Sequence, residues 1–156
     1  MDVSDAPASQ GVMIALLPTT TDWCKQDLPH LTLVYAGTID KLKPTDFNNI
    51  AKDAASLAQL ASPFYLQVAA MEKFGTPGDE VDAFRLQPTT ELWAMRRFVE
   101  GWNQSEHPFN PHVTIGPAGS GAMLNVIPKV IGFNQIYVGW GDEGLTFNLT
   151  RGSSSY

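Results

Sequence analysis

The stretch PHLTLVYAG at residues 29–37 decides how this chain is interpreted, because the segment NPHVTIGPAG around His112 repeats its pattern. Each copy has a histidine, any residue, a threonine and a large aliphatic residue. Side chains alternate between the two faces of a β-strand, so the histidine and the threonine of each copy are expected on one face. The other face is apolar. The sequence therefore predicts two strands that each present one imidazole and one hydroxyl.

These two pairs, His30 with Thr32 and His112 with Thr114, suit acid–base chemistry on a phosphodiester. The ordinary pKa of imidazole lies near neutrality, so one ring can take a proton while the other gives one. Threonine hydroxyls can donate hydrogen bonds to non-bridging phosphate oxygens. A single His-x-Thr pattern is typical of an ordinary half-buried strand, but two copies in matching contexts indicate a site. We expect no metal and no other cofactor, since the chemistry requires none and the acidic residues show no metal-ligand spacing.

Composition limits the class of protein. The 156 residues, 44% of them hydrophobic, predict a single domain at residues 11–150 between flexible tails at 1–10 and 151–156. The single cysteine, Cys24, excludes an internal disulfide and favours the cytoplasm. A net charge of −6 argues against long duplex nucleic acid and favours a nucleotide or short oligonucleotide as partner. No apolar run is long enough to cross a membrane, and the pattern leaves the oligomeric state open.

The order of expected elements indicates an α+β fold. We expect strands at 11–18 and 30–37, a helix at 43–62, a hairpin at 64–74 and 81–88, a second helix from 88–91 onward with a threonine N-cap, a strand at His112, and closing strands at 134–140 and 145–149. Each half then places one helix against one histidine strand. This predicts a duplicated, two-lobed architecture in which two mostly antiparallel sheets form a central cleft and the helices pack outside.

With these segments the chain resembles the two-histidine (2H) phosphoesterases, the LigT-like superfamily that includes bacterial RNA 2′,3′-cyclic phosphodiesterases, formerly called 2′-5′ RNA ligases. GVMIALLP resembles the first strand of that family, VAAMEKFG with VDAFRL its middle hairpin, and IYVGWGDEGLTFNL its closing hairpin. The short connection before the first motif is similar to compact bacterial and phage-borne versions. Many relatives carry an arginine just after the second motif, where this chain has Gly116 and Pro117.

The resemblance implies that His30, Thr32, His112 and Thr114 are catalytic. The implied activity is metal-independent hydrolysis of a nucleotide 2′,3′-cyclic phosphate, or of a short oligonucleotide with a 2′-5′ or cyclic linkage. The sequence does not assign which histidine is the base and which is the acid. Two alternatives stay open. One is a viral enzyme that degrades cyclic oligonucleotide immune signals, and the other is a non-catalytic nucleotide-binding or structural module that keeps the two-histidine cleft.

Four further residues are candidates for substrate binding. Phe74, in the middle hairpin, is expected either to stack on a base or to pack in the core. Trp23 and Lys25 precede the first motif and are expected at the rim of the cleft, with an exposed loop as the alternative. Arg85 lies in a strand from which it can reach the site.

Three other residues are expected to have structural roles. Tyr35 follows Thr32 by three residues, so strict alternation places it on the opposite face, in the core. Arg96 and Arg97 are expected on the solvated face of the second helix.

Overall fold

The computed structural model describes residues 11–24 and 28–151. Lys25 and the expected tails, apart from Arg151, lie outside these residues. The backbone N–H of Arg151 donates to the carbonyl of Ala61 at 3.0 Å, and its carbonyl accepts a hydrogen bond from the Ser62 hydroxyl at 2.7 Å. The packed domain therefore continues at least one residue beyond the expected end at 150.

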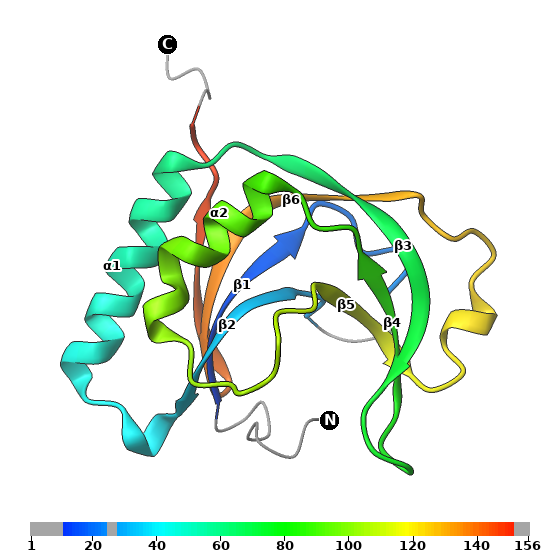
Figure 1. The fold of residues 1–156 in the computed structure, drawn as a ribbon, viewed down its shortest axis with the longest axis horizontal. Coiled ribbons are helices and arrows are strands. Elements are labelled where there is room, and N and C mark those ends of the chain that lie inside the picture. The colour runs from blue at the N-terminus through cyan, green and yellow to red at the C-terminus, as the bar shows by residue number, and fades with distance from the viewer. Residues whose placement is uncertain (1–10, 25–27, 152–156) are drawn as a thin grey trace.

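The first half of the molecule is built around β1 (Gly11–Pro18). This strand lies between β2 (Leu31–Thr38) and β6 (Val130–Trp140) and is antiparallel to both, while β7 (Glu143–Asn148) pairs with β6 (Figure 1). Consecutive residues of β1 point to opposite faces, yet Ile14 and Ala15 are both fully buried. Burial on both faces explains why β1 reads as a continuous apolar run rather than an alternating one.

The second half contains β3 (Phe64–Phe74), β4 (Val81–Leu86) and β5 (His112–Pro117), all antiparallel. Residues 64–67 of β3 pair with β6, whereas residues 68–74 pair with β4. The two sheets that we expected are therefore joined through β3 into one seven-stranded sheet, in which six strands follow the order β2-β1-β6-β3-β4-β5 and β7 pairs with β6 outside this order. The predicted α+β class with antiparallel strands is confirmed. The sheet curves so that its two edge strands, β2 and β5, come into contact.

Helix α1 (Pro44–Leu60) begins at a proline, which suits the first helical position, and the Asp46 carboxylate accepts a hydrogen bond from the Lys43 backbone N–H at 2.9 Å. The helix ends before Ser62, because the residue before a proline disfavours the helical conformation. Its buried face, which contains Ile50, Ala54, Leu57 and Ala58, packs against β6 and β7. We had expected α1 to pack against a histidine strand, and this expectation is wrong.

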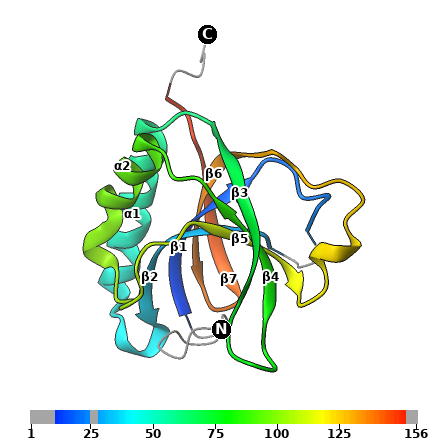
Figure 2. The same cartoon turned by 45° about the vertical axis from the view of Figure 1, so that its right-hand side comes forward.

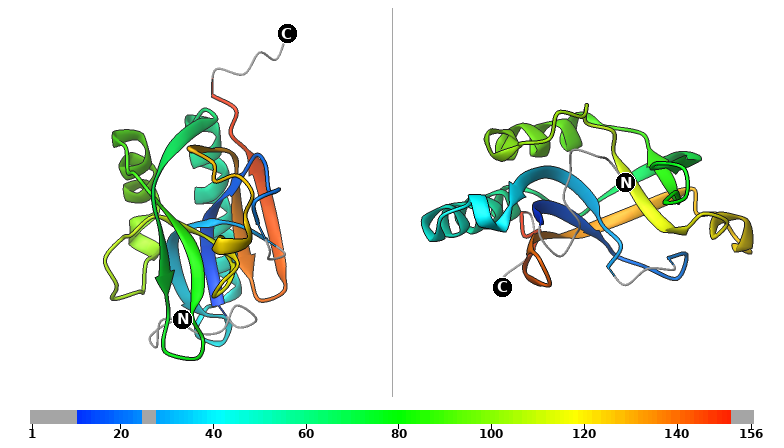
Figure 3. Two further views of the ribbon diagram at one scale, coloured as in Figure 1. Left: turned by 90° about the vertical axis from the view of Figure 1, so that its right-hand side faces the viewer. Right: turned by 90° about the horizontal axis from the view of Figure 1, so that it is seen from below.

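Helix α2 (Thr90–Val99) has the predicted threonine N-cap, since the Thr89 hydroxyl accepts a hydrogen bond from the backbone N–H of Leu92 at 3.2 Å. It contacts β2 and α1, so both helices lie on the same side of the molecule (Figures 2 and 3). Helix α2 follows β4 in the second half of the chain but packs on the histidine strand of the first half. Neither helix of the described part of the chain is long and apolar enough to cross a membrane. Three short 3-10 helices complete the structure, η1 (Ile39–Lys41), η2 (Glu100–Trp102) and η3 (Gly121–Met123).

One hydrophobic core serves both halves. Phe133 of β6 stacks on Phe64 of β3 with ring centroids 5.7 Å apart, and Phe84 of β4 meets the edge of Trp23 at 5.6 Å. Phe84 and Phe133 are both fully buried. Since the same cluster contains residues of β1, β2, β4 and β5, the two histidine strands are held by shared packing.

A buried carboxylate fixes the connection that follows β5. Asp82 of β4 is 5% exposed and accepts hydrogen bonds from the backbone N–H groups of Gly119 at 3.0 Å and Gly121 at 2.9 Å. A Cβ added at position 121 would lie 2.2 Å from the sulfur of Met71 and 3.2 Å from a carboxylate oxygen of Asp82, so the Met71 side chain would have to shift. The two hydrogen bonds to Asp82 thus hold the connection against β4.

We expect Asp82→Ala to lower the free energy of unfolding by about 1.5–3 kcal/mol, since it leaves two backbone donors without their charged acceptor. Urea unfolding followed by circular dichroism measures this change. Asp79→Ala, at an exposed turn position, is the matched control and is expected to have little effect. Equal midpoints for the two variants would contradict this role for Asp82.

Candidate active site

The two motif histidines are oriented in the same way. Nδ1 of His30 lies 2.8 Å from the carbonyl oxygen of Leu28, and Nδ1 of His112 lies 2.8 Å from the carbonyl oxygen of Asn110. A carbonyl only accepts hydrogen bonds, so Nδ1 carries the proton in each neutral ring and Nε2 is the basic nitrogen. In each case a proline separates the carbonyl from the histidine and favours an extended residue before it. The repeated unit is therefore Pro-His-x-Thr, a signal present in the sequence that we did not use.

Each motif threonine lies beside an alanine. Thr32 on β2 pairs with Ala15 on β1, and Thr114 on β5 pairs with Ala83 on β4. Both threonines are half-buried, whereas both alanines are fully buried. Partners in an antiparallel pair point to the same face, so the strand partner of each threonine presents only a methyl group. The Thr32 hydroxyl in addition lies 3.9 Å from the sulfur of Met13, to which it donates.

The curvature of the sheet brings the two motifs together. Strands β2 and β5 are in contact, and the thiol of Cys24, six residues before His30, lies 3.7 Å from the carbonyl oxygen of Thr114. Burial lowers the pKa of His30, the carbonyl of Leu28 opposes this change, and the charge of the nearby His112 lowers the pKa further. The His30 imidazole is therefore neutral at pH 7, with Nε2 able to accept a proton.

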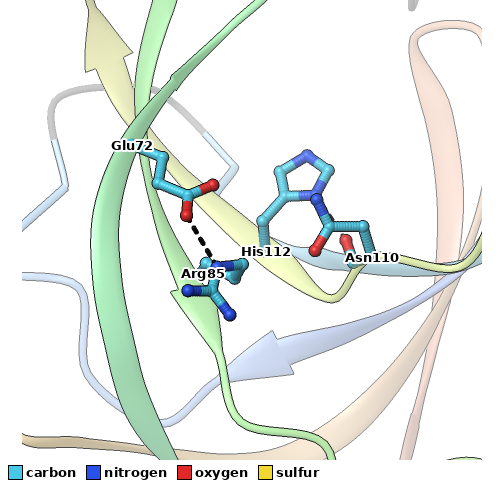
Figure 4. Close-up of polar contacts among 4 residues, drawn as sticks. All are labelled: Glu72, Arg85, Asn110 and His112. Atoms are coloured by element: carbon cyan, nitrogen blue, oxygen red, sulfur yellow. Dashed lines mark hydrogen bonds and ion pairs between the residues drawn. The ribbon is translucent and has the colours of Figure 1, made fainter.

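Two of the candidate binding residues, Arg85 and Phe74, lie next to His112. Arg85 is the partner of His112 in the β4–β5 pair, and its Nε donates to a carboxylate oxygen of Glu72 at 2.7 Å (Figure 4). Phe74 stacks on the His112 ring with centroids 4.6 Å apart and an angle of 21° between the planes. In this structure the stacking partner of Phe74 is thus the histidine itself. Glu72, which carries the counter-charge of Arg85, was not among the residues that we singled out.

The structure corrects three other expectations. Trp23 is not at a rim, because it is 5% exposed and packs on Phe84 in the core, while Lys25 lies outside the described residues. Arg96 is not on a solvated face, because it is 8% exposed, whereas Arg97 is exposed as expected. Tyr35 is half-buried and shares the face of Thr32, for a reason given below.

A hollow of about 240 Å³ opens beside the first motif. It is lined by Leu28 and Pro29, which orient His30, and by Gln135 of β6. Its volume is below the ~300–1,000 Å³ typical of sites for drug-sized ligands, so it suits a small group. Among the described residues, no group of three or more His, Cys, Asp or Glu side chains could hold a metal ion.

Solved structures share this fold over nearly the whole chain. Usb1 from Kluyveromyces marxianus has a TM-score of 0.64 at 9% identity, covering 90% of this chain and 99% of its own. TT0787 of Thermus thermophilus has a TM-score of 0.58 at 12% identity, covering 94% and 100%. LigT from E. coli in complex with 3′-AMP has a TM-score of 0.57 at 18% identity, covering 91% and 99%. No curated protein sequence matches the chain significantly.

The fold is thus that of the LigT-like 2H phosphoesterases. A sequence model of the 2′-5′ RNA ligase superfamily matches residues 21–135, which include both motifs. The chain belongs to the 2′-5′ RNA ligase superfamily, as the resemblance predicted. Membership indicates a phosphodiesterase or RNA-processing activity, in a superfamily whose members are generally hydrolases or ligases.

Proposed function

We propose that this protein is a metal-independent phosphodiesterase that hydrolyses a nucleotide 2′,3′-cyclic phosphate or a short oligonucleotide with a 2′-5′ or cyclic linkage. The observation that carries the proposal is the matched pair of histidines, one directly before β2 and one at the start of the contacting strand β5, each with Nδ1 held by the carbonyl two residues earlier. LigT of E. coli has been crystallised with 3′-AMP and with NADP⁺, and both of these ligands are nucleotides.

In this mechanism His30 is the general base. Its lowered pKa keeps Nε2 unprotonated at neutral pH, where it takes a proton from the attacking water. The water oxygen bonds to phosphorus while the bond to one ribose oxygen breaks. His112 would give an Nε2 proton to that leaving oxygen, while its Nδ1–H stays hydrogen-bonded to the carbonyl oxygen of Asn110. Exchange with solvent then restores both protonation states.

The threonines and Arg85 would hold the phosphate. The hydroxyls of Thr32 and Thr114 would donate to two non-bridging oxygens, and Thr32 would exchange its weak 3.9 Å contact with the Met13 sulfur for the phosphate. In this chain no arginine follows the second motif. Arg85, on the strand that pairs with β5 at His112, would supply the positive charge instead. Phe74 would keep the His112 ring in place by stacking, and Lys25 remains a proposed contact outside the described residues. Trp23 is buried and has no part in this proposal.

The expected substrate is small, because the net charge of −6 disfavours long duplex nucleic acid. The single cysteine is consistent with action in the cytoplasm.

The test is incubation with 2′,3′-cyclic mononucleotides, 2′-5′ dinucleotides and cyclic dinucleotides, in the presence of a chelator, with products identified by mass spectrometry. We expect hydrolysis of at least one of these classes at a rate that the chelator does not change. Products from cyclic dinucleotides alone would favour degradation of a cyclic signal. Tight binding of a nucleotide without turnover would instead favour the non-catalytic module.

The pH dependence of kcat/KM tests the assignment of the base. The usual pKa of a histidine side chain is 6.5, and the pKa of His30 is lowered from this value. His30 therefore stays unprotonated, and able to act as a base, when the pH falls to 6.5. We therefore expect the acidic limb of the bell-shaped profile to have its midpoint below pH 6.5. The measurement is initial rate against pH at low substrate concentration. A midpoint at or above 6.5 would contradict the assignment of His30 as the base.

A further inference from the structure

Arg96 is a buried cation that the proposed chemistry does not use. Its side chain extends from α2 to the outer edge of β2, where Nη1 donates a hydrogen bond to the carbonyl oxygen of Leu33. Burial lowers the pKa of Arg96, and the charge of Glu100, directly after the end of α2, opposes this change. Within residues 11–24 and 28–151, Nε of Arg96 is buried without a hydrogen-bond partner. A buried guanidinium with an unmet donor is costly, and an apolar side chain of similar length would avoid that cost.

The carbonyl that Arg96 binds belongs to a β-bulge directly after the first motif. Thr32 pairs with Ala15 and Val34 pairs with Ile14, so Leu33 is an extra residue without a partner on β1. A bulge of this kind turns the following side chains to the other face of the strand. Tyr35 therefore pairs with Met13 on the face of Thr32, whereas strict alternation had placed it in the core. Arg96 thus holds the backbone at the position where β2 departs from regular geometry.

The same guanidinium also contacts the segment that leads to the second motif. Its Cζ lies 5.0 Å from the ring centroid of Phe109, and Trp93 of α2 meets that ring edge-on at 5.1 Å. Phe109 precedes Asn110, whose carbonyl orients the His112 ring. Leu33 lies three residues after His30, and Phe109 lies three residues before His112. Arg96 therefore links the backbone that follows His30 to the Phe109 side chain that precedes His112.

We propose that Arg96 is a positioning residue that fixes the relative placement of His30 and His112, by pinning the bulge after Thr32 and the aromatic ring before Asn110. This inference rests on the proposed function of the two histidines. A planar guanidinium can donate in its plane and bind a ring with its face at the same time, which explains why arginine suits this position.

The test compares Arg96→Met, which keeps the apolar stem, with Arg96→Lys, which keeps the charge. Arg97→Met, at the exposed neighbouring position, is the matched control. We expect Arg96→Met to lower kcat about 10- to 100-fold with KM changed by less than about twofold, since a displacement of ~1 Å at the reacting groups has effects of this size. Arg96→Lys is expected to recover part of the loss, and Arg97→Met to match the wild type.

An NMR titration of the histidine ring protons gives a readout that does not depend on turnover. We expect the pKa of His30 to move toward 6.5 in Arg96→Met, because His30 and His112 no longer keep their burial and spacing, and to stay unchanged in Arg97→Met. If the wild type hydrolyses none of the nucleotides, the proposed function fails, but this titration still decides the role of Arg96. An unchanged His30 pKa in folded Arg96→Met, or an equal loss of kcat in Arg97→Met, would overturn the proposal.

Phe109→Leu keeps the test decisive if Arg96→Met does not fold. This substitution removes the ring that the guanidinium contacts but leaves an apolar side chain in its place. We expect Phe109→Leu to change kcat and the His30 pKa in the same direction as Arg96→Met, but by a smaller amount. Wild-type values for both quantities in Phe109→Leu and in Arg96→Lys would count against the bridge.

Discussion

Replacing His30 or His112 by alanine is expected to lower kcat by about 10²- to 10⁴-fold, the range for loss of a general acid or base. Each ring is proposed to move one of the two protons in the reaction, and the same backbone contact orients each Nε2. The double variant is expected to be little slower than either single one, because the two residues act as a unit. The measurement is single-turnover hydrolysis of the best substrate from the nucleotide panel.

His107 is the matched control for these variants. It is the third histidine of the chain, lies at an exposed position in the loop before the second motif, and belongs to neither pair. We expect His107→Ala to have nearly wild-type kcat, with circular dichroism showing a folded protein for all variants. Full activity in folded His30→Ala or His112→Ala would refute the proposed function.

Replacing Phe84 by alanine is expected to lower the free energy of unfolding by about 3–5 kcal/mol, the usual cost of deleting a buried aromatic ring. Phe84 is fully buried, pairs with Val113 next to His112, and packs edge-on against Trp23 from the β1–β2 connection. Its loss therefore weakens the contact between the two halves of the core. Urea unfolding followed by tryptophan fluorescence measures this change.

Phe98→Ala is the control for that substitution. Phe98 lies on α2 and is 44% exposed, so its loss is expected to change the unfolding free energy by no more than about 0.5 kcal/mol. A similar cost for the two phenylalanine variants would contradict the role that we assign to Phe84 in joining the halves.

The sequence predicts the local features of this protein well, because these depend on short-range rules. The apolar periodicity and the flanking prolines locate α1, and Thr89 marks the start of α2. Alternation along a strand places each histidine and its threonine on one face. The repeated motif identifies the family, which the match over residues 21–135 confirms.

The features that the sequence did not predict depend on contacts between distant segments. A bulge changes the face of every later residue in its strand, so Tyr35 could not be placed by counting. Arg96 was expected in solvent because arginine is usually exposed, but an unpaired strand edge and an aromatic ring give it partners inside the fold. Trp23 follows no periodic pattern, and only the packing of its connection on β4 shows that it is buried.

The change of partner within β3 limits how the two motifs can move. At this point the backbone N–H of Val68 donates to Lys129 at 2.9 Å, and that of Gln87 donates to Gln67 at 2.8 Å, so both sides of the junction are anchored. Sliding of one half past the other would break these bonds together with the ladders on either side. In the proposed function, a nucleotide would therefore meet two imidazoles on segments that this strand pairing already holds in place.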